Sequence, residues 1–149
     1  MIKIKYIKDI APIEILPQGN WIDLRAGEDV FIPEGSFAMI PLGVAMKLPK
    51  GYEAIVAPRS STFKNYGLIQ TNSIGVIDSS YCGDEDEWKL PVYCLVGNTE
   101  VNGVKGTLIR KNDRICQFRL LENQPKEKLL TVDKLGKANR GGFGSTGKQ

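Results

Sequence analysis

The sequence predicts an all-β fold. Short segments alternate apolar and polar residues with a period of two, the spacing at which side chains of a strand reach the same face. Glycine and proline separate these segments at intervals of about 8–12 residues, and no long window shows the period of a helix. This combination is typical of a sandwich, a barrel or a jelly roll.

The expected strands begin at the N-terminus, where Ile2, Ile4 and Tyr6 alternate with lysines and predict a strand with one solvent-exposed face. Residues 62–67 are expected to hold one helical turn. Pro91 is expected at a strand start or on an edge strand, because proline cannot donate a backbone hydrogen bond. The other expected strands are residues 21–26, 30–32, 37–44, 45–48, 52–57, 74–77, 90–96, 107–110, 115–121 and 129–132.

Length and composition predict one domain and exclude several kinds of site. The 149 residues carry a net charge of +3, which suits a small anionic ligand but is too weak to indicate nucleic acid. No apolar run is long enough to cross a membrane, so no membrane association is expected. The three cysteines lack metal-binding or CxxC spacing, which favours a cytoplasmic location. The absence of histidine excludes serine–histidine triads, cysteine–histidine dyads and histidine-bound zinc.

A glycine-rich segment ends the sequence. Residues 134–149 contain five glycines, few apolar residues and no strand pattern. Such a composition is typical of a mobile arm. We therefore expect a β domain over residues 1–133 and a flexible C-terminal arm over residues 134–149.

The stretch from Asn72 to Gly83 is the strongest candidate for a functional site. An apolar run at residues 74–77 leads to the carboxylate of Asp78, and the ring of Tyr81 follows after two serines. A strand that ends in an acid and turns into an aromatic residue would place both against a ligand, with Gly75 allowing a close backbone approach. The alternative is an ordinary hairpin with a solvated aspartate at its corner.

Two further candidates lie earlier in the sequence. Asp23 is set in an otherwise apolar strand pattern. Arg59, Ser60 and Ser61 directly follow a predicted strand, and a planar arginine fork with two hydroxyls suits phosphate oxygens. The alternative for the second segment is a type I turn with a surface arginine.

Two more candidates lie near the C-terminus. Residues 111–117 form a turn that runs into a strand and include Gln117, although alone they indicate only a hairpin corner. Residues 140–147 combine glycines with hydroxyls and would wrap phosphates with backbone N–H groups, or else form a disordered tail. They are not a P-loop, because no Gly-Lys-Ser/Thr ends the run.

Together the five segments resemble the trimeric dUTPases, which hydrolyse dUTP to dUMP and pyrophosphate. The second to fifth family motifs match residues 57–60, 75–83, 113–117 and 142–147, and residues 21–24 resemble a loose version of the first. The sequence is most similar to the dUTPases of Bacillus-type bacteria and their phages. The resemblance implies a β jelly roll that forms a homotrimer, with dUTP bound at sites shared between subunits.

The resemblance also implies the catalytic groups. Asp78 matches the general base that polarises the attacking water, and an ordinary aspartate is only a weak base. Most of the rate is therefore expected from neutralising the triphosphate, by Mg²⁺ and by Arg59, Ser60 and Gln117. Mg²⁺ would be held chiefly by phosphates and water, with Asp23 supporting it indirectly from its second coordination sphere.

Recognition of base and sugar follows from the same resemblance. Asn72 and backbone groups at Gly75 and Ile77 are expected to read uracil, because a hydrogen-bonding site rejects the wrong edge strongly. Tyr81 would stack under the deoxyribose, and Phe143 would cover the base when the arm closes. The remaining residues expected to bind substrate are Ser61, Arg140, Gly144, Ser145 and Thr146.

Several features depart from the family pattern, among them Cys82 in place of a frequent arginine and Ser80 in place of a frequent acid. The arginine that relatives place five residues before the phenylalanine is Ala138 here, which leaves open whether Arg140 reaches the γ-phosphate. The acidic insert 84–88 is expected to be a solvated loop, with the alternative that Trp88 shares the capping of the base. The insert 98–106 is expected to form a hairpin without an assigned role.

Two rival functions stand beside dUTP hydrolysis. The dCTP deaminases share the jelly roll and an Arg-Ser-Ser run, but they need a glutamate on the strand after the aspartate turn, and residues 90–96 contain no acid. Phage members of the family also act as regulators by docking on repressors. A regulatory protein partner of that kind would use the inserts at 84–88 or 98–106, and such a role is compatible with catalysis.

Overall fold

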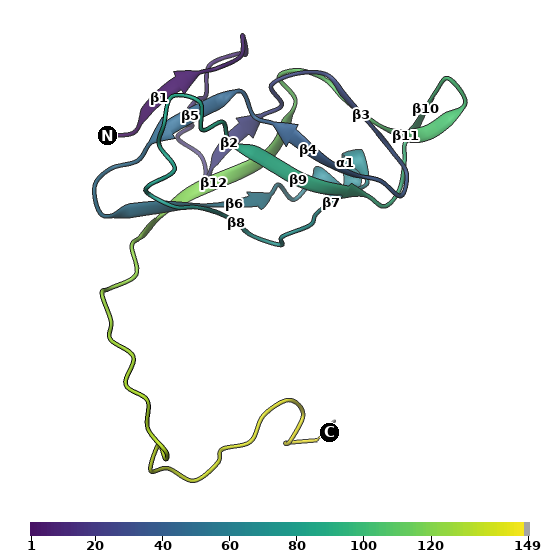
Figure 1. The fold of residues 1–149 in the computed structure, drawn as a ribbon. Helices are drawn as coiled ribbons and strands as arrows, with labels where there is room; N and C mark the ends of the chain where they lie inside the picture. The colour runs from purple at the N-terminus through teal and green to yellow at the C-terminus, as the bar shows by residue number, and fades with distance from the viewer. Residues whose placement is uncertain (148–149) are drawn as a thin grey trace.

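The computed structural model describes residues 1–147 and confirms the all-β prediction (Figure 1). Residues 148–149 of the predicted arm lie outside this range. Within it, no helix has the length and apolarity needed to cross a membrane. The elements are β1 (Lys3–Tyr6), β2 (Ile22–Arg25), β3 (Val30–Pro33), β4 (Phe37–Pro41), β5 (Val44–Lys47), β6 (Tyr52–Pro58), α1 (Thr62–Tyr66), β7 (Leu68–Gln70), β8 (Gly75–Ile77), β9 (Lys89–Cys94), β10 (Thr99–Val101), β11 (Val104–Ile109) and β12 (Arg114–Glu122).

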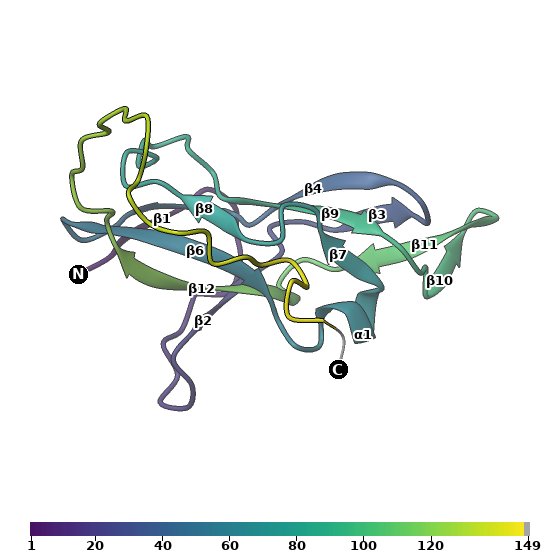
Figure 2. The ribbon, with the colours of Figure 1, turned by 90° about the horizontal axis from the view of Figure 1, so that it is seen from below.

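The strands form small antiparallel sheets around one core (Figures 1 and 2). The largest sheet has the order β2-β12-β6-β8, and a second has the order β4-β9-β7. Along β6, Ala54 and Val56 are buried, and along β9, Leu90 and Val92 are buried. This alternation is the period of two that the sequence shows, and it directs both sheets into a shared core.

The predicted hairpin at residues 98–106 is confirmed and has a clear local cause. β10 and β11 pair directly, and Asn102 and Gly103 between them both have positive φ angles. Asn-Gly is the sequence that best fits such a two-residue turn. In both views the hairpin projects from one end of the body (Figures 1 and 2).

Two expectations about strands are wrong and a third holds in part. The strand predicted at the N-terminus is confirmed as β1, but all four of its residues are exposed, and it pairs only with β5 in a two-stranded sheet. Residues 129–132 form no strand: Leu129 and Leu130 are almost fully exposed, with no strand beside them to pair with. Pro91 lies inside β9, which is the central strand of its sheet.

The backbone explains how β9 accommodates Pro91. The carbonyl oxygen of Pro91 accepts a hydrogen bond from the N–H of Thr71, so this side of the residue faces the end of β7. In an antiparallel strand the nitrogen of a residue points to the same side as its carbonyl. The nitrogen of Pro91 therefore faces the end of β7, where the pairing between β7 and β9 stops, so few hydrogen bonds are lost there.

Trp88 corrects the expectations for the acidic insert. Asp84 and Glu85 are exposed, but Trp88 is fully buried and packs edge-to-face on Phe118, with ring centroids 5.2 Å apart. The backbone N–H of Trp88 donates to the carbonyl of Val44, which ties the insert to β5. Trp88 therefore belongs to the core and cannot cap a base.

Candidate active site

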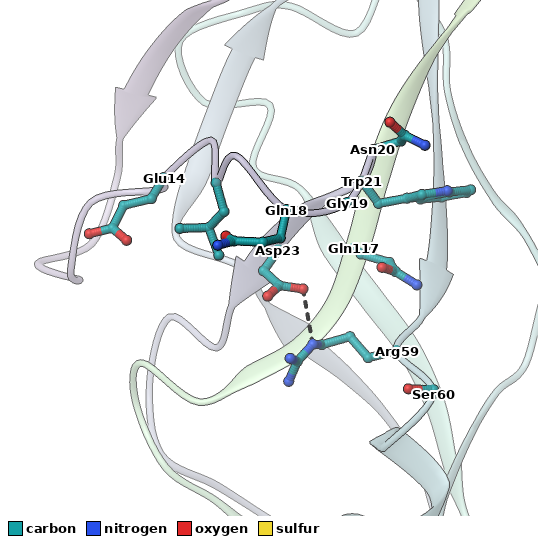
Figure 3. A pocket seen from close by; sticks show the side chains of 10 residues that line it. Glu14, Gln18, Gly19, Asn20, Trp21, Asp23, Arg59, Ser60 and Gln117 are labelled. Carbon is teal, nitrogen blue, oxygen red and sulfur yellow. Dashed lines mark ion pairs between the residues drawn. The ribbon is translucent and has the colours of Figure 1, made fainter.

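One group of predicted site residues meets on three neighbouring strands. Gln117 on β12 lies directly opposite Asp23 on β2 and Ala57 on β6. Residues that face each other in an antiparallel ladder point to the same side of the sheet. Arg59 comes two residues after Ala57, so its side chain reaches the same face, as Figure 3 shows.

Arg59 is held by several contacts. Its Nε lies 2.9 Å from Asp23 Oδ1, and its Nη1 donates to the carbonyl of Arg114 at 3.2 Å. Both charged side chains are partly buried, which screens this pair less than a surface ion pair. Arg114 also approaches Asp23, at 3.9 Å. The guanidinium is therefore oriented before any ligand arrives.

Thr62 is a residue that the sequence analysis missed. It is buried in the first turn of α1, where its Oγ1 accepts from the N–H of Arg59 at 2.9 Å and donates to the carbonyl of Ile115 at 2.9 Å. This hydroxyl fixes the turn that carries Arg59 and Ser60. A threonine three residues after the arginine, at a predicted helical turn, is the signal that could have found it.

Asp23, Arg59, Ser60 and Gln117 line one cavity of about 310 Å³ (Figure 3). Gln117 Nε2 donates to the carbonyl of Pro58, which holds its side chain across the ladder. The loop before β2 also lines the cavity, and its part was not foreseen because residues 14–20 carry no recognisable motif. It contributes Glu14, Leu16, Gln18, Gly19 and Asn20, beside Trp21 from the loose first motif.

The second group of predicted residues follows along one segment. β8 ends at Ile77, and Asp78 opens a tight turn in which the N–H of Tyr81 donates to the Asp78 carbonyl. Asp78 Oδ1 accepts from the Ser80 hydroxyl at 2.7 Å and from the Ser80 N–H at 2.8 Å. These two bonds, the hydroxyl first, hold the pKa of Asp78 below its usual value.

Tyr81 stands beside this carboxylate with its ring fixed. Its hydroxyl donates to the carbonyl of Glu87 at 3.0 Å, and the residue is 40% exposed. Partial burial, Asp86 and Glu87 raise the pKa of Tyr81. The ring is therefore neutral and anchored at its tip, with a face available for stacking.

Asn72 lies at the other end of the segment, in a constrained loop. Ser73 has a φ of 58°, which non-glycine residues rarely adopt, and the N–H of Ile74 donates back to the Asn72 carbonyl. Gly75 lies opposite Val56, and a Cβ on Gly75 would come 3.1 Å from the Val56 Cβ. Any larger residue at this position would press on Val56, so Gly75 fits the close approach predicted for it.

Asp78 does not meet the first group within one chain, although Ser73, beside Asn72 in the same segment, lines a cavity together with Arg59 and Ser60. Ile77 pairs with Ala54, so Asp78 lies beside the start of β6, whereas Arg59 follows its end. At about 3.3 Å per residue, this separates Asp78 from Arg59 by roughly 20 Å. A general base must reach its water within hydrogen-bonding distance of the reacting group. Asp78 and Arg59 of the same chain therefore cannot act on one phosphate.

The arm residues form a third, separate group. Figure 1 shows the segment after β12 leaving the body. Its described residues include Arg140, Phe143, Gly144, Ser145 and Thr146, all exposed. Within residues 124–147, the loop and turn hydrogen bonds join only Ser145 to Gly142 and Gly147 to Gly144.

No cluster of three or more acidic, cysteine or histidine residues in the described part of the chain could hold a metal ion. Asp23 already pairs with Arg59, and Glu14 is the other carboxylate that lines the same cavity. This donor set fits a Mg²⁺ ion that keeps most of its water and binds mainly through the ligand's oxygens.

Comparison with known proteins gives consistent matches. Residues 21–147 match the dUTPase family model. The chain is 55% identical over 147 residues to the SPbeta prophage-derived deoxyuridine 5'-triphosphate nucleotidohydrolase YosS of Bacillus subtilis (strain 168), covering 98% of this chain and 97% of that protein.

Two solved structures share the fold. The Staphylococcus bacteriophage 80alpha dUTPase with dUPNHPP has a TM-score of 0.80 at 19% identity and covers 99% of both chains. A mutant dUTPase from phage phi11 of S. aureus, described with a structural Mg(II) ion, has a TM-score of 0.74 at 16% identity and covers 91% of this chain and 98% of that one. At these identities the likeness establishes the architecture, which is the predicted jelly-roll type.

The Ser80 hydroxyl gives a prediction for Asp78. Replacing Ser80 with alanine removes the larger of the two hydrogen bonds that stabilise the carboxylate, so the pKa of Asp78 should rise. Carboxyl ¹³C NMR titration of wild type and Ser80→Ala measures this directly, with Ser79→Ala as the matched control. An unchanged pKa of Asp78 in Ser80→Ala would show that the Ser80 hydroxyl does not lower it.

Proposed function

The chain belongs to the dUTPase family and hydrolyses dUTP to dUMP and pyrophosphate, and we propose that it does so in a site assembled from several copies of the chain. One observation carries this proposal. Asp78 and Arg59 lie roughly 20 Å apart along β6, although both match motifs that serve one triphosphate. A second copy must therefore supply the phosphate-binding groups beside Asp78.

In this mechanism Asp78 orients a water molecule and accepts its proton. The water oxygen bonds to the α-phosphorus, the bond from this phosphorus to the bridging oxygen breaks, and pyrophosphate leaves. The lowered pKa keeps Asp78 ionised at neutral pH, so the base is always available but weak. Its exposed position leaves room for water.

The phosphates would meet the group around Arg59 of another copy. The guanidinium, oriented by Asp23, and the hydroxyls of Ser60 and Ser61 neutralise and position the phosphate oxygens. Gln117 adds a side-chain amide from β12. Mg²⁺, when bound, would supply further neutralisation of charge on the triphosphate. Asp23 would act on its water shell rather than as a direct ligand.

The base and sugar would lie along the segment from Asn72 to Tyr81. Asn72 reads uracil together with backbone groups at Gly75 and Ile77, and the anchored ring of Tyr81 packs under the deoxyribose. Phe143 covers the base once the arm closes. Arg140, Gly144, Ser145 and Thr146 would then reach the phosphates, which explains an arm without fixed contacts in the free chain.

A homotrimer is the assembly that we propose for these shared sites. Support comes from large apolar side chains that one copy leaves uncovered, including Val76 on β8 at 65% exposure and Leu129 at 100%. The free cysteines Cys82, Cys94 and Cys116 fit a reducing cytoplasm, where we place the enzyme. Sedimentation and cell fractionation test the two statements.

The deaminase alternative finds no support in the second sheet. β9, from Lys89 to Cys94, follows the Asp78 turn and carries no acid for deamination. A regulatory role is a second proposal, because the phage 80alpha dUTPase is described as controlling the transfer of virulence genes. The projecting β10–β11 hairpin is the surface we propose for such a partner, and shortening it at Asn102-Gly103 should abolish repressor binding while sparing catalysis.

Asp78→Asn tests the catalytic assignment. It should lower kcat for pyrophosphate release from dUTP by about 10²–10⁴-fold while a non-hydrolysable dUTP analogue still binds, because only the proton acceptor is lost. Asp84→Asn, in the same exposed loop, is the matched control and should keep wild-type kcat. Chelating Mg²⁺ should slow the wild-type enzyme. Full turnover in Asp78→Asn, or ammonia release from dCTP, would refute this mechanism.

Removing residues 138–149 tests closure of the arm. The truncated enzyme should remain trimeric, since we place its core contacts in the β domain. Its kcat/KM should fall at least about tenfold, because one hydrogen bond to a charged group is worth about 1.5–3 kcal/mol. Steady-state kinetics beside sedimentation analysis measures both properties, and an unaffected rate would disprove the closing role.

A further inference from the structure

A buried amide lies directly behind Asn72. Gln70, the last residue of β7, is 5% exposed. Its Nε2 donates to the carbonyl oxygen of Val56 at 3.1 Å and to Asn72 Oδ1 at 2.9 Å. Val56 belongs to β6 and therefore to the other large sheet, so Gln70 links the two sheets at the base of the Asn72 loop.

The partners of Gln70 fix the orientation of its amide. A backbone carbonyl only accepts hydrogen bonds, so the group that faces Val56 must be the NH₂. Both amide protons are then used, and Oε1 is left buried without a hydrogen-bond partner in the described structure. Turning the amide over would place Oε1 against the Val56 carbonyl and break both bonds. Gln70 therefore has one stable orientation.

This orientation determines that of Asn72. Because Gln70 presents a donor, Asn72 turns its Oδ1 toward Gln70, and the NH₂ at the other end of the Asn72 amide points away from Gln70. An exposed asparagine amide without such a partner turns over readily, since water satisfies both orientations. The adjacent backbone also limits movement, through the positive φ of Ser73 and the contact between Gly75 and Val56.

We propose that Gln70 is a positioning residue that determines the choice of pyrimidine: it locks the Asn72 amide so that it offers a donor to the base. This inference rests on the proposed role of Asn72 in reading uracil. Uracil carries an acceptor oxygen at position 4, whereas cytosine carries a donor amine there. The NH₂ of Asn72, held in place by Gln70, can donate to the uracil oxygen but meets the cytosine amine as a second donor. Gln70 opposes the turnover of the Asn72 amide that would let its oxygen accept from that amine instead.

The test compares how dUDP and dCDP inhibit dUTP hydrolysis. In Gln70→Leu the Asn72 amide is free to turn over and can accept a hydrogen bond from cytosine. The inhibition constant of dCDP divided by that of dUDP should therefore fall by about tenfold. The kcat at saturating dUTP should change little, because Asp78 and the phosphate-binding groups are untouched. Leu68→Val, a buried change on the same face of β7, is the matched control and should keep the wild-type ratio.

A double-mutant cycle separates this inference from the function on which it rests. If Gln70 acts through Asn72, Gln70→Leu should not change the ratio further in the Asn72→Ala background. An unchanged ratio in Asn72→Ala alone would overturn the reading of uracil by Asn72. A changed ratio there, with no change in folded Gln70→Leu, would overturn only the role of Gln70.

A measurement on the wild-type protein keeps the proposal testable if Gln70→Leu does not fold. Both side-chain NH₂ protons of Gln70 are buried and hydrogen-bonded, so NMR should show that they exchange slowly with water. Rapid exchange of these protons would overturn the lock.

Discussion

The length of β6 is the constraint on which the active site depends. This strand joins the two halves of the proposed catalytic site, with Asp78 beside its start and Arg59 after its end. This strand cannot shorten, because β12 pairs with it along its whole length and β8 pairs with its residues 54–56 on the other side. The halves therefore stay roughly 20 Å apart in any one copy.

This separation gives each half its own rigid support. Asp23, Arg59 and Gln117 are fixed by the ladder of β2, β12 and β6 and by the Thr62 hydroxyl. Asp78 and Tyr81 are fixed by a turn whose groups bond to one another and to the acidic insert. Both halves are thus formed before a ligand binds, so that binding need not order them. In the proposed mechanism, the arm is the part that substrate binding would order.

Much of this architecture was predictable from the sequence. Strands such as β6 and β9 were predicted correctly, because burial of one face of a strand requires apolar residues at every second position. The strand predicted at residues 129–132 is wrong because an apolar segment forms a stable strand only where another strand offers free backbone groups to pair with. The burial of Trp88 was not predicted, because the acidic residues before it indicate a solvent-exposed loop. Its packing partner Phe118 lies 30 positions later in the sequence.

The site was predictable in composition but not in arrangement. The motifs select Asp78, Arg59 and Gln117 as candidate site residues, yet no sequence pattern shows that β6 keeps Asp78 and Arg59 apart. Thr62 and Gln70 were missed because their roles depend on carbonyls of Ile115 and Val56, which only the folded ladder presents. A sequence pattern does not show which side chain will form a hydrogen bond to a backbone atom that is distant in the sequence.

Mixing two inactive variants tests the shared site most directly. Asp78→Asn and Arg59→Gln chains, co-refolded in equal amounts, should form trimers in which some sites combine the intact Asp78 of one chain with the intact Arg59 of another. Random assembly makes roughly one quarter of the sites complete, so roughly one quarter of the wild-type rate of pyrophosphate release should return. Activity no higher than that of either parent alone would contradict a site shared between copies.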